Sequence, residues 1–403
     1  MTTYLEAAED AYLGLLGRWG NMDTVRGAPD GFWITANTFN AFLDYWICTG
    51  QAPDQNINLP IIDYFHETVK ADATDDDLKT IEKNGFQGLP GGMWLDDYGW
   101  WGNAFLTAWE NADALGLSGD DVALCNQSAI NCWTIMKYGW DTKNTAPVPG
   151  GVWNCHHEDS SHHLDWSLTG RNTVTNSVFW LMSVRLKALT GDSQYVDLNN
   201  SLQWFQNGFG KGLLFDKTKD DQNIYTVRER FIGENDWDAA PKGFYWAGDQ
   251  GLFLRCLFEE KRPMPDFEQL KTEIVNAVWN NMVDEQHVIH DHPMPGFEDD
   301  YATGKGVFIR HALKIVQLTG NQTLKECIMA SANFAWNTSK EESDLHHYFQ
   351  FCWNPEGMQT GNWDTTYKEE DTLSAIRGVI LQASGLDAIS AAAALSPGGV
   401  IPN

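Results

Sequence analysis

Residues 171–197, RNTVTNSVFWLMSVRLKALTGDSQYVD, contain the pattern that predicts the fold. A long apolar stretch with helical periodicity ends in the turn LTGD, residues 189–192. The glycine of this turn suits the left-handed conformation that ends a helix. The aspartate that follows suits the cap of the next helix. The stretch therefore predicts a helix, a tight turn and the start of a second helix.

Three similar turns occur elsewhere: CTGQ at 48–51, LSGD at 117–120 and LTGN at 318–321. Thr49 and Ser118 are 69 residues apart, and Ser118 and Thr190 are 72 apart. The interval from Thr190 to Thr319 is 129 residues, or about two such periods. A chain of 403 residues accommodates about six units of this size. Periodicity of this length predicts stacked helical hairpins.

Six helices lead into these turns and into two less regular ones. Each follows a long loop rich in glycine, tryptophan and asparagine, and each precedes a short turn. Their predicted ranges are 33–48, 97–115, 173–189, 249–258, 305–318 and 370–382. Six helices of one polarity, each with an antiparallel partner, close naturally into a ring. We therefore expect an all-α protein with an (α/α)6 barrel of six helical hairpins, and one catalytic domain over residues 1–403. An open solenoid or two bundles would need a linker or polar capping repeats, and we find neither.

The composition restricts the class of partner. There are 27 basic and 55 acidic residues, which gives a net charge of −28. Such a charge repels phosphate backbones and anionic lipids, so we expect neither nucleic acid nor a membrane surface as partner. Many of the 19 tryptophans occur in polar, glycine-rich segments: Trp153, Trp166, Trp237, Trp246 and Trp363. Flat aromatic faces stack on sugar rings, so a neutral carbohydrate is a favoured ligand.

Cysteines and targeting signals say little about the compartment. Seven scattered cysteines form no C-x-x-C pair, so a reducing compartment and a secreted protein with one or two bridges both fit. No signal peptide precedes Met1, and no run of 18 apolar residues predicts a membrane span. We expect a secreted or extracellular monomer.

The segment GGMWLDDYGWWGNAF, residues 91–105, contains the candidate catalytic pair, Asp96 and Asp97. If six helices begin at one end of a ring, their positive dipole ends and free N–H groups stabilise carboxylates there. One aspartate suffices to cap a helix. A second one among aromatic rings favours a functional role over a capping role. The flanking rings, which we predict to bind substrate, belong to Trp94, Tyr98, Trp100 and Trp101.

The same end of the ring should collect further polar and aromatic side chains. Amides and carboxylates bind sugar hydroxyls, and aromatic rings bind sugar faces. The remaining predicted substrate-binding residues are Asn37, Trp153, Arg171, Asn172, Asn176, Trp246, Asp249, Gln250 and Lys305, with Asn40 close to Asn37.

Two carboxyl groups beside stacked sugars fit glycoside hydrolysis. One protonates the leaving oxygen, and the other attacks the anomeric carbon or activates water. Neighbouring residues at a helix start can place their carboxyl groups about 5–6 Å apart, close to the spacing of retaining enzymes. Their mutual repulsion raises the pKa of one of them. This chemistry needs no cofactor and no metal.

The segment WLDDYGWWGNAF, residues 94–105, resembles the catalytic Asp-Asp motif of glycoside hydrolase family 76. This family includes the endo-α-1,6-mannanases and related fungal wall transglycosidases. Further segments resemble the family in the same order: GGVWN at 150–154, the stretch from residue 171 quoted above, GDQGLFL at 248–254, GKGVFIRHALKIV at 304–316 and LQASGLDAIS at 381–390.

The resemblance implies the same barrel and a retaining mechanism, with Asp96 as nucleophile and Asp97 as acid/base. It also implies an α-mannan or manno-oligosaccharide substrate with α-1,6 linkages. Asp249 departs from the family pattern, which usually has asparagine there, and this bears on sugar contacts and pH behaviour. Two histidine-bearing loops, at 154–166 and 284–300, are also unusual and bear on substrate length and branching.

These loops raise the question of a metal site. In the first loop the spacing of His156, His157, His162 and His163, with Glu158 and Asp159, matches no standard zinc site, so we expect no metal. In the second, His290 and His292 are spaced as on one face of a strand, and with His287 they predict a short hairpin that lines the cleft.

Three rival functions remain open on the sequence alone. A sugar 2-epimerase on the same barrel would use histidine pairs, but among the predicted inner helices only His311 occurs. An unsaturated glucuronyl hydrolase would need basic residues for its uronate, whereas this rim is acidic. A barrel that binds glycans without turnover would not need the intact Asp96 and Asp97.

Overall fold

The structure is a computed structural model of the whole chain. It describes residues 1–19, 31–51, 71–84, 93–143, 146–156, 170–197, 200–217, 225–231, 246–291, 298–342, 345–355 and 375–402. Helices dominate these residues. The strands form three antiparallel pairs: β1 with β2, β3 with β4, and β5 (Lys340–Glu342) with β6 (Leu345–Tyr348).

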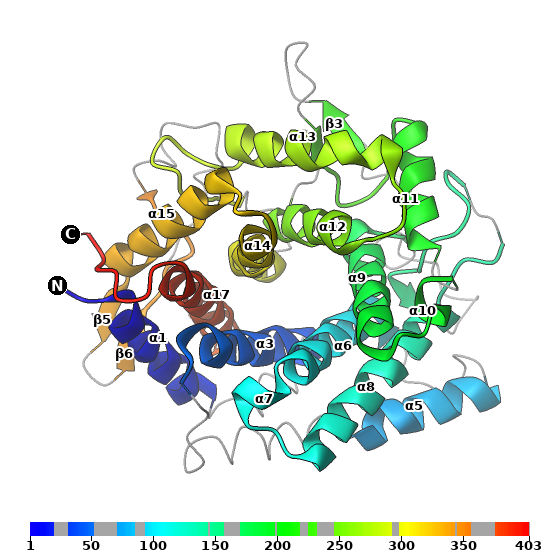
Figure 1. The fold of residues 1–403 in the computed structure, drawn as a ribbon, viewed down its shortest axis with the longest axis horizontal. Helices are drawn as coiled ribbons and strands as arrows, with labels where there is room; N and C mark the ends of the chain where they lie inside the picture. Colours follow the sequence, from blue (N-terminus) through cyan, green and yellow to red (C-terminus); the bar gives the residue numbers. More distant parts are fainter. Residues whose placement is uncertain are drawn as a thin grey trace.

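Six inner helices form a closed ring (Figure 1). Each packs against the next one in the chain, and the last packs against the first. The (α/α)6 prediction is therefore confirmed. In order around the ring, the helices are α3 (Gly31–Thr49), α6 (Leu95–Glu110), α9 (Thr173–Thr190), α12 (Ala247–Glu259), α14 (Glu298–Thr319) and α17 (Ala375–Leu395).

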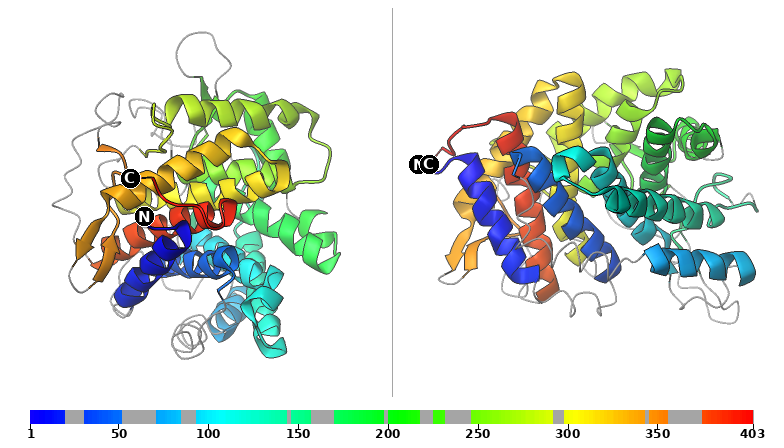
Figure 2. Two further views of the ribbon diagram at one scale, coloured as in Figure 1. Left: turned by 60° about the vertical axis from the view of Figure 1, so that its left-hand side comes forward. Right: turned by 60° about the horizontal axis from the view of Figure 1, so that its bottom comes forward.

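A second layer of helices lies outside the ring (Figure 1). Its members are α1 (Tyr4–Trp19) on α17, α8 (Gly119–Tyr138) on α6, α5 (Ala71–Asn84) on α8, α11 (Ser201–Gly210) on α9, α13 (Pro265–Asn281) on α12 and α15 (Gln322–Thr338) on α14 and α17. The two ends of the chain meet, because Thr3 forms a β-bridge with Val400. Figure 2 shows α1 lying along α17 as a result.

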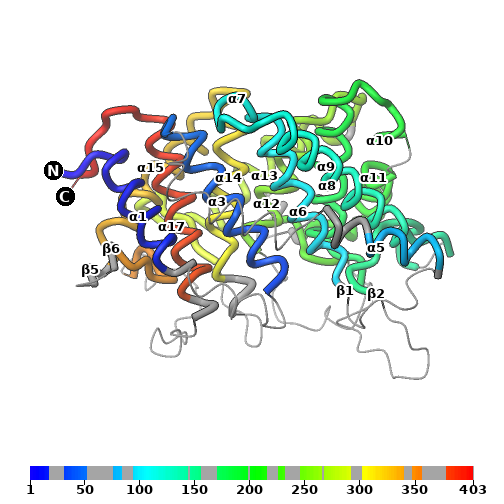
Figure 3. The backbone as a smooth tube through the Cα atoms, turned by 90° about the horizontal axis from the view of Figure 1, so that it is seen from below, coloured from blue at the N-terminus to red at the C-terminus, as the bar shows by residue number. Residues whose placement is uncertain are grey.

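The inner helices share one polarity. In Figure 3, β1 (Met93–Trp94) and β2 (Cys155–His156) lie at the start of α6. The short helices α7 (Ala112–Leu115) and α10 (Gln194–Asp197), which follow α6 and α9, lie at the opposite end. We call the end at which the inner helices begin the amino end, and the other the carboxyl end. The predicted polarity is confirmed.

Aromatic side chains fill the space between the two layers. Trp180, Phe205 and Phe253 are fully buried, and their ring centroids lie 4.9 to 6.0 Å apart. Burial of each such ring stabilises the fold by about 2–3 kcal/mol. Tilted and edge-to-face contacts of this kind add to that stabilisation.

Glycines allow the inner helices to approach closely on one side of the ring. A Cβ atom on Gly251 of α12 would lie 2.8 Å from the Phe308 Cα atom of α14. A Cβ atom on Gly306 of α14 would lie 2.6 Å from the Ser384 Cα atom of α17. Both separations are too short for a real contact. The α12–α14–α17 packing therefore requires glycine at these positions.

Three of the four predicted turns have the expected glycine conformation. Gly50, Gly191 and Gly320 have φ values of +67°, +74° and +71°. In addition, the Asn321 side chain accepts a hydrogen bond of 3.0 Å from the Leu324 N–H and caps α15. The prediction of a glycine stop followed by a polar cap is confirmed for this last turn.

The LSGD turn differs from the prediction. Ser118 forms a capping box with Asp121, so α8 begins at Gly119, which is helical. The left-handed glycine is Gly116, with φ +64°, at the end of α7. The serine therefore fixes the helix start, and an earlier glycine provides the stop.

Three predicted helices have clearly different bounds. The helix expected at 305–318 is α14, which begins earlier, at Glu298, and ends at Thr319. The helix expected at 97–115 begins at Leu95 and is divided at Asn111, which has a φ of −117° and a ψ of 24°. The helix expected at 370–382 runs over α17, Ala375–Leu395, and its predicted first five residues lie outside the described ones.

One window of α17, Gly378–Leu395, is long and apolar enough to cross a membrane by length and composition. Of this window, 89% is buried inside the structure, as in the core helix of a globular protein. None of the seven cysteines forms a disulfide bond in the described part of the chain, and five of them are buried.

Candidate active site

Asp96 and Asp97 are the second and third residues of α6, at the amino end of the ring. Trp94 occupies the capping position, with φ −88° and ψ 123°, and its side chain makes no capping hydrogen bond. Neither aspartate is therefore the N-cap of this helix. Their position in the first turn still places both carboxyl groups near the positive end of the helix dipole.

The start of α6 is fixed by its neighbours in the barrel. Strand β1 pairs with β2, and the Leu95 N–H donates a hydrogen bond of 2.8 Å to the Asn154 carbonyl oxygen. On α6 itself, a Cβ atom on Gly99 would lie 2.2 Å from Val178 Cγ2 of α9. The glycine therefore lets the first turn of α6 lie directly against α9.

Asp96 is partly exposed as a residue, but its Oδ1 atom is buried and has no hydrogen-bond partner among the described residues. Burial, the largest cause, raises the pKa of Asp96 to about 7. Glu229 raises this pKa further, whereas Arg230 and backbone N–H groups of the first turn lower it. A carboxyl group with this pKa exchanges its proton near neutral pH, as general acid–base catalysis requires, whereas a nucleophile must be ionised.

Glu229 and Arg230 were not identified from the sequence. They follow β4 (Tyr225–Val227), which pairs with β3 (Phe215–Lys217), and both are largely buried. Arg230 Nε donates to Glu229 Oε2 over 2.8 Å, and Asn172 Nδ2 donates to Glu229 Oε1 over 3.1 Å. The only sequence signal was an acidic and a basic residue side by side in VRER, residues 227–230, which is weak.

Asp249 is fully buried in the first turn of α12, and neither of its carboxyl oxygens has a hydrogen-bond partner among the described residues. Burial raises the pKa of Asp249 well above its usual value, and Glu229 and Asp291 raise it further. The protonated, neutral form of Asp249 is therefore favoured relative to that of an exposed aspartate.

Asp291 and Lys305 are two further buried charged groups, and each acts on the pKa of the other. Asp291 precedes α14 in the chain, and Lys305 is the eighth residue of this helix. Asp291 Oδ1 accepts a hydrogen bond of 2.7 Å from the Ala247 N–H, and burial raises the pKa of Asp291 to about 7. Lys305 Nζ donates to the Phe351 carbonyl oxygen over 2.5 Å, and burial lowers the pKa of Lys305. Nζ also lies 3.9 Å from the centre of the Phe351 ring, so internal partners surround this predicted substrate-binding residue.

The aromatic candidates fall into two groups. Trp100 and Trp246 are largely buried and meet edge to face, with centroids 6.1 Å apart, where α6 and α12 begin. Trp101 is fully buried, and its Nε1 donates to the Phe32 carbonyl oxygen over 3.0 Å. The Tyr98 hydroxyl donates to Asp77 over 2.7 Å. These four rings belong to the packed interior.

Trp94 and Trp153 are the partly exposed rings among the described candidates. They lie in the two adjoining segments that fix the start of α6, since Trp94 precedes this helix and Trp153 precedes Asn154. The Arg171 guanidinium lies 5.0 Å from the centre of the Trp153 ring. These two tryptophans are the best placed of the predicted rings to contact a ligand.

Several predicted polar residues are occupied by internal partners. Arg171 is fully buried, pairs with Asp141 over 3.1 Å and donates to the carbonyl oxygens of residues 146, 148 and 150. The others hold helices and loops together: Asn172 caps α9, Asn176 bonds the Val152 backbone, Gln250 bonds the Val227 backbone, and Asn37 accepts from Arg310. Direct ligand contact would require these bonds to break.

The histidine-bearing loops are described only in part. A β-bridge between Val283 and Ile289 forms the short hairpin that was predicted, and His290 Nε2 lies 2.6 Å from Asp284 Oδ2. Residues 157–169 and His292 lie outside the described residues. Within the described part of the chain, no group of three His, Cys, Asp or Glu side chains is arranged to hold a metal ion.

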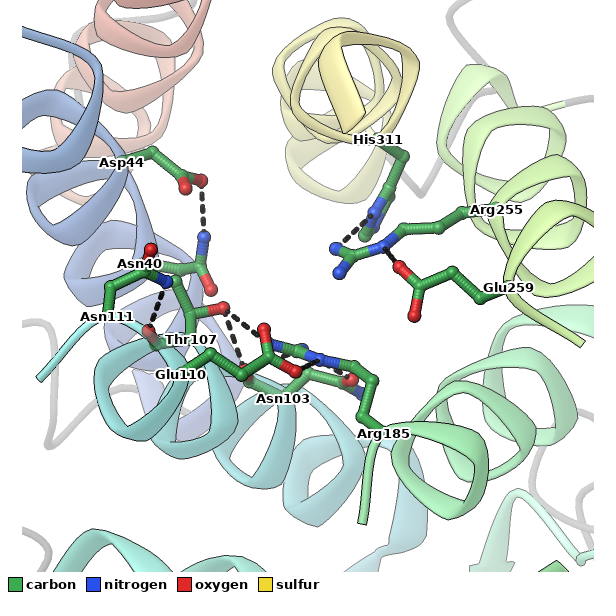
Figure 4. Close-up of polar contacts among 10 residues, drawn as sticks. All are labelled: Asn40, Asp44, Asn103, Thr107, Glu110, Asn111, Arg185, Arg255, Glu259 and His311. Carbon is green, nitrogen blue, oxygen red and sulfur yellow. Dashed lines mark hydrogen bonds and ion pairs between the residues drawn. The ribbon is translucent and has the colours of Figure 1, made fainter. Parts of the chain in front are cut away.

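His311, the histidine predicted on an inner helix, belongs to a polar network inside the ring (Figure 4). Its Nδ1 lies 3.3 Å from Arg255 Nη1, and burial together with nearby arginines lowers its pKa well below the usual value. In the same network, Arg185 pairs with Glu110 and Arg255 pairs with Glu259, near the ends of α6 and α12. The network lies toward the carboxyl end of the ring, away from the first turn that contains Asp96.

A barrel with an acidic pair in the first turn of its second inner helix can be compared with known families. The sequence model of glycosyl hydrolase family 76 matches residues 3–391. The chain belongs to this family. The protein is therefore a member of a glycoside hydrolase family, which supports glycan processing in general.

Several solved structures share the fold at low sequence identity. The Dfg5 protein from Chaetomium thermophilum, in complex with glucosamine, is 16% identical with a TM-score of 0.66, over 97% of this chain and 90% of that one. An inactive variant of an α-1,6-mannanase from Salegentibacter sp. HEL1_6, in complex with α-1,6-mannotriose, is 13% identical with a TM-score of 0.60, over 98% and 100%.

A family 76 mannosidase from Bacteroides thetaiotaomicron is 12% identical with a TM-score of 0.57, over 96% and 98% of the two chains. No curated protein matches the chain.

Proposed function

We propose that this family 76 protein is a retaining hydrolase of α-1,6-mannosidic linkages. The observation that carries the proposal is the position of Asp96 beside Asp97 in the first turn of α6, where burial raises the pKa of Asp96 to about 7. Glycosidases pair an ionised carboxylate with a carboxyl group of raised pKa that donates the proton. Here the raised pKa falls on Asp96, to which the family resemblance gives the nucleophile role, so the pH dependence of kcat/KM decides between the two roles.

Similar proteins support the choice of substrate and of the acidic pair. The Salegentibacter α-1,6-mannanase is described as inactive when two consecutive aspartates are replaced by asparagines or by alanines. These variants were obtained in complex with α-1,6-mannotriose and α-1,6-mannotetrose. Asp96 and Asp97 are also consecutive, in a chain of the same fold and family.

In the proposed mechanism, Asp96 attacks the anomeric carbon while Asp97 protonates the leaving glycosidic oxygen. A glycosyl–enzyme ester on Asp96 results. Asp97, now ionised, then takes a proton from water, which attacks the anomeric carbon and releases Asp96. The sugar keeps its configuration after two inversions. The first step needs Asp96 ionised and Asp97 protonated, and the ionised form of Asp96 accumulates as the pH rises through about 7.

Trp94 and Trp153 are proposed to stack on mannose rings next to this pair, because both are partly exposed in the segments that fix α6. A neutral α-mannan suits a protein with a net charge of −28, because a neutral polymer is not repelled. We also propose that the enzyme acts as a monomer.

The test is product analysis on linear and branched α-mannans, α-glucans and short manno-oligosaccharides. We expect cleavage of unbranched α-1,6-mannan, with products that are initially α-configured by ¹H NMR. Products that are initially β-configured would contradict the retaining mechanism. D96N and D97N, assayed separately, should lose turnover and keep glycan binding. Turnover equal to that of wild type in both variants would remove the pair from the mechanism.

A further inference from the structure

We propose that Glu229 and Arg230 are positioning residues, a fixed pair of opposite charges that sets the fraction of Asp96 that is ionised. This inference rests on the proposed function, because it assigns a role to Asp96 in catalysis. It concerns two residues outside the Asp-Asp motif, on the segment that links the starts of α9 and α12.

The backbone of this segment is clamped from both sides. From α9, the Thr173 N–H donates to the Glu229 carbonyl oxygen over 2.6 Å, and the Thr173 hydroxyl donates to the Arg228 carbonyl oxygen over 2.5 Å. From α12, the Gln250 side chain bonds both the N–H and the carbonyl oxygen of Val227, each over 2.9 Å. Glu229 and Arg230 therefore have little freedom to move relative to the two helices.

A continuous series of hydrogen bonds joins Glu229 to the helix that contains Asp96. Asn172 Nδ2 donates to Glu229 Oε1 over 3.1 Å, and Asn172 Oδ1 accepts from the Thr175 N–H over 3.0 Å. The Thr175 hydroxyl donates to Asn154 Oδ1 over 3.1 Å. The Asn154 carbonyl oxygen accepts from the Leu95 N–H over 2.8 Å, at the residue before Asp96. The charge pair and the first turn of α6 are thus held in one framework.

Glu229 and Arg230 act in opposite directions on the pKa values of two neighbouring aspartates. The Arg230 guanidinium is bonded to Glu229, yet it is also the cation that lowers the pKa values of Asp96 and Asp249, while Glu229 raises both. A low-dielectric interior strengthens such effects. Removal of either member of the pair should therefore change the ionisation of Asp96. The titratable and charged groups that act on Asp96 or lie beside it are Asp97, Cys155, Glu229 and Arg230. Glu229 and Arg230 also act on Asp249.

The test measures the titration of Asp96 directly. The full-length protein is labelled with ¹³C at the aspartate carboxyl carbon, and D96N identifies the Asp96 signal by its loss. We expect E229Q to lower the Asp96 midpoint by about one pH unit, because a negative charge is removed. We expect R230M to raise it by a similar amount, because a positive charge is removed.

The matched control is E260Q. Glu260 is also a buried carboxylate with an arginine partner, since its Oε2 accepts from Arg262 over 2.6 Å and from Trp180 over 2.8 Å, but it follows the last residue of α12 at the carboxyl end. E260Q should leave the Asp96 midpoint unchanged. Unchanged midpoints in folded E229Q and R230M, or equal shifts in E260Q, would overturn the inference.

The titration also separates this inference from the proposed function. The pH at which kcat/KM falls on α-1,6-mannan should shift with the Asp96 midpoint in E229Q. If no α-mannan is cleaved but the midpoints shift as expected, the proposed substrate is wrong and the charge pair stands. If wild type cleaves mannan and the midpoints do not shift, the charge pair is wrong and the function stands.

Discussion

Arg185 of α9 and Glu110 of α6 are joined by two hydrogen bonds inside the ring, from Nε to Oε1 over 2.9 Å and from Nη2 to Oε2 over 2.8 Å (Figure 4). Arg185 Nη1 also donates to the carbonyl and side-chain oxygens of Asn103, and Nη2 donates to the Thr107 hydroxyl. All five N–H groups of this buried guanidinium therefore have acceptors.

Replacement of Arg185 by methionine should lower the free energy of unfolding by about 3 kcal/mol, because it leaves Asn103, Thr107 and Glu110 without their donor. Urea denaturation measures the effect. The control is K271M, which breaks the pair of Lys271 with the exposed Glu268 on α13 and should change the stability by less than about 0.5 kcal/mol. An equal loss of unfolding free energy in the two variants would show that the buried Arg185 network stabilises the ring no more than an exposed ion pair does.

The acid limb of activity provides a second prediction. If Asp96 is the nucleophile and Asp97 keeps its proton over this range, kcat/KM on α-1,6-mannan should fall about tenfold per pH unit below a pKa of about 7, because the protonated Asp96 carboxyl group cannot attack. Far-UV circular dichroism at each pH controls for unfolding. A kcat/KM that is constant from pH 7 to pH 5, and falls only above pH 7, would instead assign Asp96 as the proton donor.

Site residues that lie within one short stretch of sequence could be predicted, and site residues brought together from distant stretches could not. Asp96 and Asp97 stand in one short stretch with the aromatic rings that flank them, so a linear pattern revealed them. Glu229 is brought to the site by Thr173 and Gln250, from two different helices. No local pattern encodes that meeting, so sequence reasoning missed it.

Arg171 shows that one position in a sequence can be compatible with two different structural roles. An arginine just before a helix at the amino end of the ring is compatible with a sugar ligand or with a group of loop carbonyls. The structure shows the second arrangement, with Asp141 and three backbone carbonyl oxygens as partners.

The fold was more predictable because its turns repeat. Gly191 and Gly320 end helices by the same left-handed conformation, and that repetition determines the polarity of the ring.

Helix packing provides a third prediction. G251A should lower the free energy of unfolding by about 1–3 kcal/mol, because the new Cβ would lie 2.8 Å from the Phe308 Cα atom and the backbone of α14 must shift. G210A is the matched control, since no atom lies within 4 Å of a Cβ there and the residue ends a helix. Thermal unfolding of both variants tests this. A G251A protein as stable as G210A would mean that α12 and α14 can separate without loss.

The protonated state of Asp249 provides the last prediction. In the unfolded chain an aspartate ionises near pH 3.9, whereas burial raises the pKa of Asp249 well above that in the folded protein. Between these two pKa values folding binds a proton, so the contribution of Asp249 to stability decreases as the pH rises. Asparagine has nearly the same shape and no proton to bind. D249N should therefore be more stable than wild type at pH 7.5, and this difference should shrink by about 1.4 kcal/mol per pH unit as the pH falls toward 4.

Urea denaturation of wild type and D249N at pH 4.5, 6 and 7.5 measures this difference. D120N, a substitution at an exposed aspartate, controls for the general effect of removing one negative charge from an acidic protein. A stability difference for D249N that is the same at all three pH values would show that Asp249 is ionised in the folded protein. In that case a positive group must lie against its carboxylate, and Arg230 is the nearest candidate, because it is the cation that lowers the Asp249 pKa.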